Sequence, residues 1–99
     1  MNFTTIWLDP AEADLLRFYL TARADGNAEA YTRAAARIEH VLATDPANAG
    51  ESRAGHGRVV IEIPLTVEFE VHGESRTAVV TRVRYTPARA RFGDRLVIG

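Results

Sequence analysis

Arginine is the residue of this chain best suited to binding an anion, and arginines are unevenly spread along the sequence. All 12 basic side chains are arginines, and six of them, against a single acid, follow from Arg76 onward. Residues 1–51 hold four arginines against eight acids. Because guanidinium groups bind phosphates and carboxylates well, the C-terminal half is the candidate surface for an anionic partner. The formal net charge of −1 argues against tight, non-specific binding of nucleic acid.

Arg82 and Arg84 are the first candidates for a site on this half. They are two residues apart in an expected strand, so their side chains lie on one face of the sheet. There they can hold a phosphate or the carboxylate of a partner. The alternative is a ladder of ion pairs with Glu68 and Glu70 on the neighbouring strand, which would contribute little on an exposed face.

Glu51, Arg53 and Tyr85 are further candidates. The first two lie in a polar loop, where functional residues concentrate; their alternative role is a surface ion pair with each other. Tyr85 has the same strand parity as Val79 and Val83, so packing in the core is favoured over a role as a catalytic phenol.

The sequence predicts no metal and no cofactor. It has no cysteine, which excludes disulfides, zinc–thiolate sites and a thiol nucleophile. His40, His56 and His72 fall in a helix, a loop and a hairpin, and no convergent set of ligands is visible. His56 is the one histidine considered as an acid–base group, although a flexible loop histidine is the favoured interpretation.

The signals for a first helix are clear at both of its ends. Asp9 is placed to cap the helix and Glu12 to complete a capping box. Gly26 is a good C-terminal stop. Apolar residues at helical spacing define the buried face, and we expect Leu16 and Leu20 to widen it.

Other elements surround this helix. The β-branched and aromatic run 3–8 predicts a strand before it. A second helix is expected from Asn27, as its cap, to Asp45-Pro46, because the residue before proline is pushed out of helical geometry. The short connection predicts an antiparallel helical hairpin. A polar loop follows over 45–57.

Alternating apolar and polar residues predict three strands in the second half, within 58–63, 65–72 and 77–85. The faces expected to be buried are Val59, Ile61 and Ile63; Leu65, Val67, Phe69 and Val71; and Thr77, Val79, Thr81, Val83 and Tyr85. The solvated face is expected to carry Arg58, Glu62, Glu68, Glu70, His72, Arg82 and Arg84. The predicted fold is therefore α+β, a two-layer β-α-α-β-β-β domain with the helical hairpin on one face of a mainly antiparallel sheet.

Length and hydropathy limit the possible class of protein. The 99 residues are enough for one domain, whose core is expected over about 3–86, with an arginine-rich tail over 87–99. Apolar runs are only a few residues long and no signal peptide is visible, so we expect no membrane association and a cytoplasmic location.

The order of these elements and several short motifs resemble one protein family. The motifs are Leu42-Ala43-Thr44-Asp45-Pro46, Gly50-Glu51-Ser52-Arg53, Gly57-Arg58-Val59 and Pro64-Leu65-Thr66-Val67-Glu68-Phe69-Glu70-Val71. With the last strand, 78–85, they resemble the RelE/ParE superfamily of small bacterial toxins from type II toxin–antitoxin modules, often described as plasmid stabilisation proteins. The resemblance covers nearly the whole chain.

The resemblance implies a toxin that a cognate antitoxin keeps silent. One branch of the superfamily cuts mRNA on the ribosome, and another poisons DNA gyrase without cutting RNA. A ribonuclease needs cations for the phosphate, a base for the 2′-hydroxyl and an acid for the leaving oxygen. By resemblance, the candidates for catalysis are Glu51, Arg53, Arg82 and Tyr85. Those for binding RNA or a partner are Arg53, Arg58, Arg82 and Arg84.

Departures from the ribonuclease branch favour a second interpretation. Leu65 and Thr66 stand where that branch usually has an arginine, and Glu62, Glu68 and Glu70 bring negative charge to the sheet. The prediction is the toxin component of a type II toxin–antitoxin module, for which ribosome-dependent cleavage of mRNA as an endoribonuclease is one candidate activity. The alternative is a non-enzymatic protein-binding module of the same fold, either a gyrase-inhibitor-like protein or an inactive relative. The expected partners are a cognate antitoxin, the ribosome with mRNA or DNA gyrase, and a second copy of the chain in a homodimer.

Overall fold

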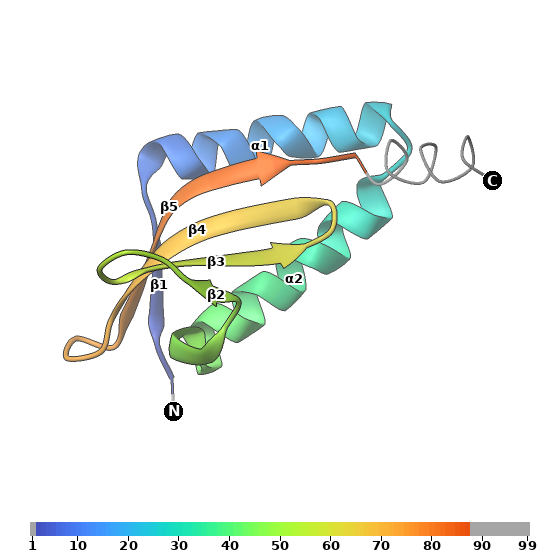
Figure 1. The fold of residues 1–99 in the computed structure, drawn as a ribbon. Coiled ribbons are helices and arrows are strands. Elements are labelled where there is room, and N and C mark those ends of the chain that lie inside the picture. Colours follow the sequence, from blue (N-terminus) through green and yellow to red (C-terminus); the bar gives the residue numbers. More distant parts are fainter. Residues whose placement is uncertain (1, 88–99) are drawn as a thin grey trace.

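A computed structural model describes residues 2–87, which form a five-stranded sheet with two helices on one face (Figure 1). The elements are β1 (Thr4–Trp7), α1 (Asp9–Ala24), α2 (Ala28–Thr44), the 3₁₀ turn η1 (Pro46–Asn48), β2 (Glu51–Ser52), β3 (Gly57–Glu62), β4 (Leu65–His72) and β5 (Thr77–Tyr85). The predicted α+β class is confirmed. The polar loop over 45–57 holds two short elements, η1 and β2, which the sequence did not indicate. The arginine-rich tail, beyond residue 87, lies outside the described residues.

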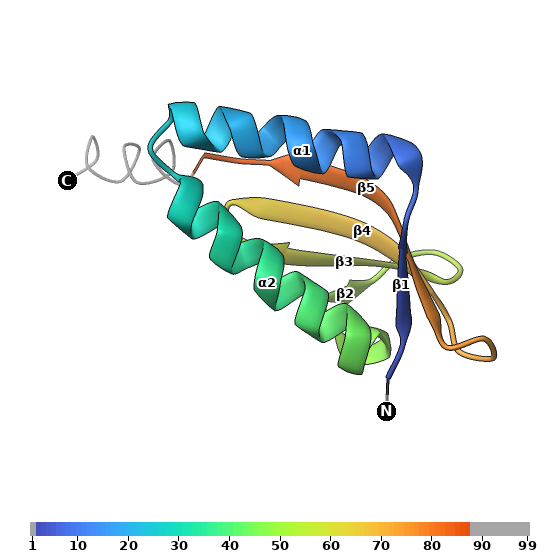
Figure 2. The ribbon, with the colours of Figure 1, turned by 180° about the vertical axis from the view of Figure 1, so that it is seen from behind.

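The sheet has the order β1-β5-β4-β3-β2, so the first and last strands are neighbours. β1 pairs with β5 in parallel, with Thr4 opposite Thr77, and all other pairs are antiparallel. Figure 2 shows both helices in front of the sheet, with α1 along β5 and α2 crossing at an angle. The helices therefore cover one face, and the other face is open to solvent.

α1 begins at Asp9, the residue expected to cap it, so the cap lies one residue earlier than predicted. Leu8 is the N-cap residue, and no side chain bonds the free N–H groups there. Asp9 already lies inside the helix, so the predicted capping box with Glu12 is wrong. Both carboxylates lie in the first turn, where negative charge is favourable near the positive end of the helix dipole.

The turn between the helices is built on Gly26, as predicted. Gly26 has a φ of 79°, and its N–H donates to the carbonyl of Arg23 at 3.1 Å. The N–H of Asn27 donates to the carbonyl of Ala22 at 2.7 Å. This pair of bonds is a Schellman motif, which satisfies the last carbonyls of α1.

The core lies between the helices and the inner face of the sheet. α1 buries Ala11 and Ala22, and α2 buries Tyr31, Ala34, Ile38 and Leu42. Trp7 and Leu15 pack against this core. The expectation that Leu16 and Leu20 join it is wrong, because they are 66% and 61% exposed.

The residues of β4 face the two sides of the sheet as predicted, but those of β3 face the opposite sides to the ones predicted. Val60 is opposite the buried Val67, so Val60 lies on the helix-covered face, as do Arg58 and Glu62. Ile61 is 63% exposed. Three successive apolar residues, 59–61, made the alternation ambiguous, and a shift of one residue exchanges the two faces of a strand.

A β-bulge explains the other difference in facing. Glu68 is opposite Arg82 and Phe69 is opposite Val80, so Thr81 is the extra residue on β5. The Thr81 hydroxyl donates to the carbonyl of Glu68 at 3.2 Å. Beyond the bulge the parity reverses, and the residues that β5 buries are Ala78, Val80 and Val83. The expected inward facing of Thr77 and Val79 is therefore wrong.

Candidate functional site

The residues predicted to form one site are divided between the two faces of the sheet. The register places Arg82 and Arg84 on the open face with Glu68. Glu51 pairs with Val59, which is opposite Glu68, so it lies on the same face. Arg58 and Tyr85 lie on the helix-covered face, opposite the buried residues Phe69 and Leu65. The six candidates therefore do not converge.

Arg82 and Arg84 are the exposed cations of the open face. Arg84 lies 3.7 Å from Glu68, measured from Nη2 to Oε2, in an ion pair with both side chains partly exposed. Arg82 is directly opposite Glu68 in the register, but within residues 2–87 it forms no ion pair. This face therefore holds part of the expected ladder, and Arg82 is exposed to solvent.

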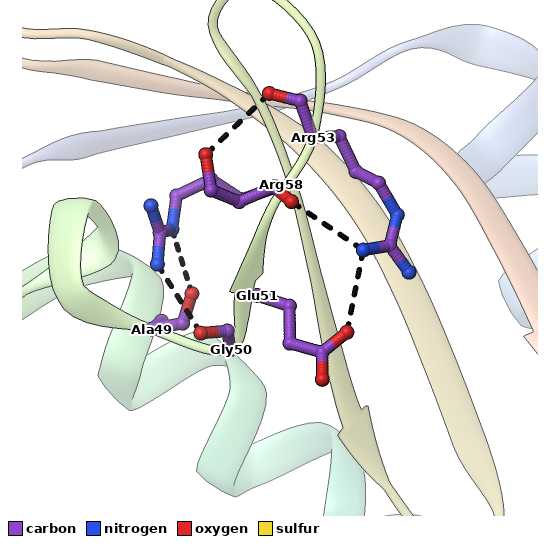
Figure 3. Close-up of polar contacts among 6 residues, drawn as sticks. Ala49, Gly50, Glu51, Arg53 and Arg58 are labelled. Atoms are coloured by element: carbon purple, nitrogen blue, oxygen red, sulfur yellow. Dashed lines mark hydrogen bonds and ion pairs between the residues drawn. The ribbon is translucent and has the colours of Figure 1, made fainter.

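Glu51 begins β2 and Arg53 directly follows it, and their side chains lie together (Figure 3). The Arg53 Nη1 lies 3.3 Å from Glu51 Oε1 and also donates to the carbonyl of Ser52 at 3.4 Å. The Glu51 side chain is 79% exposed and the Arg53 side chain is 55% exposed. The structure thus contains the surface ion pair that the sequence offered as the alternative for these residues. Such a pair is easily exchanged for contacts with a ligand.

Arg58 holds the turn that leads into β2. Its Nε donates to the carbonyl of Ala49 at 2.8 Å, and its Nη2 to that of Gly50 at 3.2 Å (Figure 3). Gly50 has a φ of 62°, and a Cβ added there would lie 1.8 Å from the carbonyl oxygen of Val59. The guanidinium of Arg58 is therefore engaged with the backbone and directed away from that of Arg53.

Tyr85 joins the end of β5 to the turn between the helices. Its hydroxyl donates to Asp25 Oδ2 at 2.9 Å and accepts from Asn27 Nδ2 at 3.2 Å. Its ring lies 6.1 Å from that of Phe18 and 6.2 Å from that of Tyr31, centroid to centroid. The side chain of Asn27 is used in this contact and does not cap α2, although Asn27 occupies the cap position.

Tyr31 is the buried member of this aromatic cluster. Its hydroxyl donates to the carbonyl of Leu15, and its ring lies 5.7 Å from that of Tyr19. Burial, followed by the nearby Tyr85, raises the pKa of Tyr31 to about 12. The raised pKa keeps the Tyr31 hydroxyl protonated, and it can therefore donate its hydrogen bond to the carbonyl of Leu15. The cluster was missed because only α1, α2 and β5 together assemble it.

Two of the three histidines are brought together at the opposite end of the sheet. The rings of His56 and His72 are 5.4 Å apart, and His72 Nε2 lies 3.2 Å from Glu70 Oε1. The N–H of Val71 donates to the carbonyl of His56 at 3.1 Å, which fixes the loop. Sequence reasoning missed this proximity, since it depends on the pairing of β3 with β4. Residues 2–87 contain no group of three or more His, Cys, Asp or Glu side chains that could hold a metal ion.

The chain shares its fold, a helical hairpin on one face of a mixed sheet, with a solved structure, as the sequence resemblance led us to expect. A chain from a solved structure, "Chromosomal ParDE TA system from P. aeruginosa", has a similar fold, with a TM-score of 0.63 and 19% sequence identity. The similarity covers 85% of this chain and 96% of that one. No protein-family model and no curated protein sequence matches. None of the helices formed by residues 2–87 is long and apolar enough to cross a membrane.

Proposed function

We propose that this chain is the toxin component of a type II toxin–antitoxin module, acting in the cytoplasm and kept silent by a cognate antitoxin. The observation that carries the proposal is the fold shared with a chain of a ParDE system over 85% of this chain and 96% of that one. The motifs Gly50-Glu51-Ser52-Arg53 and Gly57-Arg58-Val59 add support from the amino-acid sequence, which does not depend on the comparison of folds.

We further propose that the toxin acts by binding a protein target, with DNA gyrase as the target that the resemblance names. Cleavage of RNA needs a cation, a base and an acid around one phosphate. Here Tyr85 is bonded to Asp25 and Asn27 on the helix-covered face, while Arg82 lies on the open face. This separation favours the non-enzymatic alternative over the ribonuclease. A ribonuclease on the open face would rely on Glu51, Arg53, Arg82 and Arg84.

Growth of bacteria after tightly controlled induction of the chain tests the first proposal. We expect growth arrest, and relief of the arrest when the product of the adjacent gene is expressed with it. The double variant Arg82→Ala, Arg84→Ala should reduce arrest if the open face contacts the target. Arg33→Ala is the matched control, because Arg33 is an exposed arginine of α2 whose ion pair with Glu29 is long, at 3.8 Å. Normal growth with soluble, folded protein would overturn the proposal.

Two assays separate the modes of action. Mapping of mRNA 5′ ends in the arrested cells reports ribosome-dependent cleavage, and a supercoiling assay with purified chain and gyrase reports inhibition of the enzyme. We expect inhibition of supercoiling and unchanged mRNA ends. New mRNA ends that depend on Arg82 would instead establish the ribonuclease and reject the protein-binding mode.

A further inference from the structure

One stripe of α1 faces solvent although it is partly apolar. Its members share one side of the helix, since they are spaced by three, four or one residues, and all are exposed: Glu12, Ala13, Leu16, Leu20, Arg23 and Ala24. Within residues 2–87, Leu16 and Leu20 are the two most exposed leucines, at 66% and 61%. We call these six residues the α1 outer stripe. Leu16 and Leu20 are one helical turn apart and together form an exposed apolar patch with charged residues near its ends, a feature of surfaces that bind another protein.

The α1 outer stripe is nearly palindromic. Its N-terminal half holds a charged residue, an alanine and a leucine, and its C-terminal half holds the same three kinds of residue. Leu16 and Leu20 are equally far from residue 18, which is therefore the centre of the stripe. The charges at its ends are opposite, Glu12 near the N-terminus and Arg23 near the C-terminus. Eleven residues separate them, about 16 Å along the axis, too far to pair within one helix. Among residues 2–87 neither of them forms an ion pair.

This pattern fits a second copy of the same chain. When two α1 helices pack antiparallel about a two-fold axis level with residue 18, Leu16 lies against Leu20 of the other copy. Glu12 then lies beside Arg23 of the other copy, so the symmetric interface holds two ion pairs between opposite charges. Ala13 and Ala24 are small and let the helices approach closely.

We propose that the chain forms a homodimer through antiparallel packing of the α1 outer stripe. The interface is isologous, because the same stripe is used on both copies. It is narrow, so the dimer is weak and its population depends on concentration. The open face of the sheet lies on the side away from the helices (Figure 2), so the proposed interface uses none of the residues of that face.

The first test is sedimentation equilibrium of the full chain over a concentration series up to about 1 mM, the range of weak association. We expect the mass to rise from 10.9 kDa toward twice that value. Leu16→Glu should abolish the rise, and it should leave the fold intact because Leu16 is exposed. A chain that stays monomeric throughout overturns the proposal and leaves the stripe to a different partner.

A charge exchange tests the register of the helices. Glu12→Arg and Arg23→Glu each place like charges opposite each other, and each should raise the dissociation constant about tenfold. The double variant restores opposite charges and should return the dissociation constant to within about threefold of the original. Glu39→Arg, an exposed residue of α2, is the control and should have no effect. Single variants that are not rescued by the double variant would reject the antiparallel register.

Discussion

The two faces of the sheet use the same residue types for different purposes. On the helix-covered face, Arg58 bonds two backbone carbonyls and Tyr85 bonds Asp25 and Asn27. On the open face, Arg84 has only a 3.7 Å contact with Glu68. Residue type alone thus does not identify a functional arginine. Substitutions on the covered face should lower stability, whereas those on the open face should change binding and leave stability nearly unchanged.

The largest expected effect comes from adding a methyl group beside Arg58. Gly50→Ala should lower the free energy of unfolding by about 3 kcal/mol, because the new Cβ meets a carbonyl at 1.8 Å and the φ is positive. Gly55→Ala is the matched control: its φ is also positive, at 65°, but nothing lies within 4 Å, so only backbone strain of about 1 kcal/mol is expected. Urea denaturation measures both. Equal losses of unfolding free energy in the two variants would show that the close approach of Gly50 to the Val59 carbonyl does not contribute to the effect.

The buried phenol of Tyr31 should make stability depend on alkaline pH. Its folded-state pKa of about 12 is above the value of 10.0 usual for a tyrosine in water. Above pH 10 the unfolded chain loses the proton more readily than the folded chain, so the free energy of unfolding falls as the pH rises. We expect a fall of about 2 kcal/mol between pH 10 and pH 12 from this group. Urea titrations of the parent and of Tyr31→Phe should differ in slope over this range, and identical slopes would contradict the assignment.

Tyr85→Phe separates a structural role from a catalytic one. Loss of the contacts to Asp25 and Asn27 should lower the free energy of unfolding by about 1–2 kcal/mol. Growth arrest should persist at a temperature where the variant is folded, since the proposed function does not use the phenol. Loss of arrest with unchanged stability would instead mark Tyr85 as part of the site.

The smallest expected change in stability belongs to the open face. Arg82→Ala with Arg84→Ala should change the free energy of unfolding by less than about 0.5 kcal/mol, because the one ion pair lost is partly exposed. Thermal denaturation beside the parent chain measures this. A large loss would mean that the open face is stabilised in the same way as the covered face, and the contrast between the two would fail.

Much of the fold could be predicted from local signals. Gly26 and Asp45-Pro46 set the ends of the helices, and the clean alternation of β4 set its facing. The errors arose where a local pattern was ambiguous or interrupted. The run 59–61 has no polar residue to fix its parity, and the extra residue at Thr81 reverses the parity of the first half of β5.

The candidate site was less predictable because it depends on those same parities. Arg58 is predicted on the same face as Arg82 and Arg84, but the reversed facing of β3 places it on the helix-covered side, where it bonds the carbonyls of Ala49 and Gly50. The parity of Tyr85 was judged correctly, since it follows the bulge on the same side as Val83. The contacts of Tyr85 with the helical turn could not be foreseen, because residues nearly sixty positions apart form them.

The parallel pairing of β1 with β5 has a consequence for synthesis on the ribosome. Thr4 is opposite Thr77, so β1 cannot pair with β5 until the chain has been synthesised beyond residue 77. The contacting residues are far apart in sequence, and such contacts form slowly. Until β5 leaves the exit tunnel, the apolar side of β4 and the ring of Trp7 lack their final neighbours. The nascent chain therefore cannot form the complete sheet, or the surfaces that depend on it, before β5 has been synthesised.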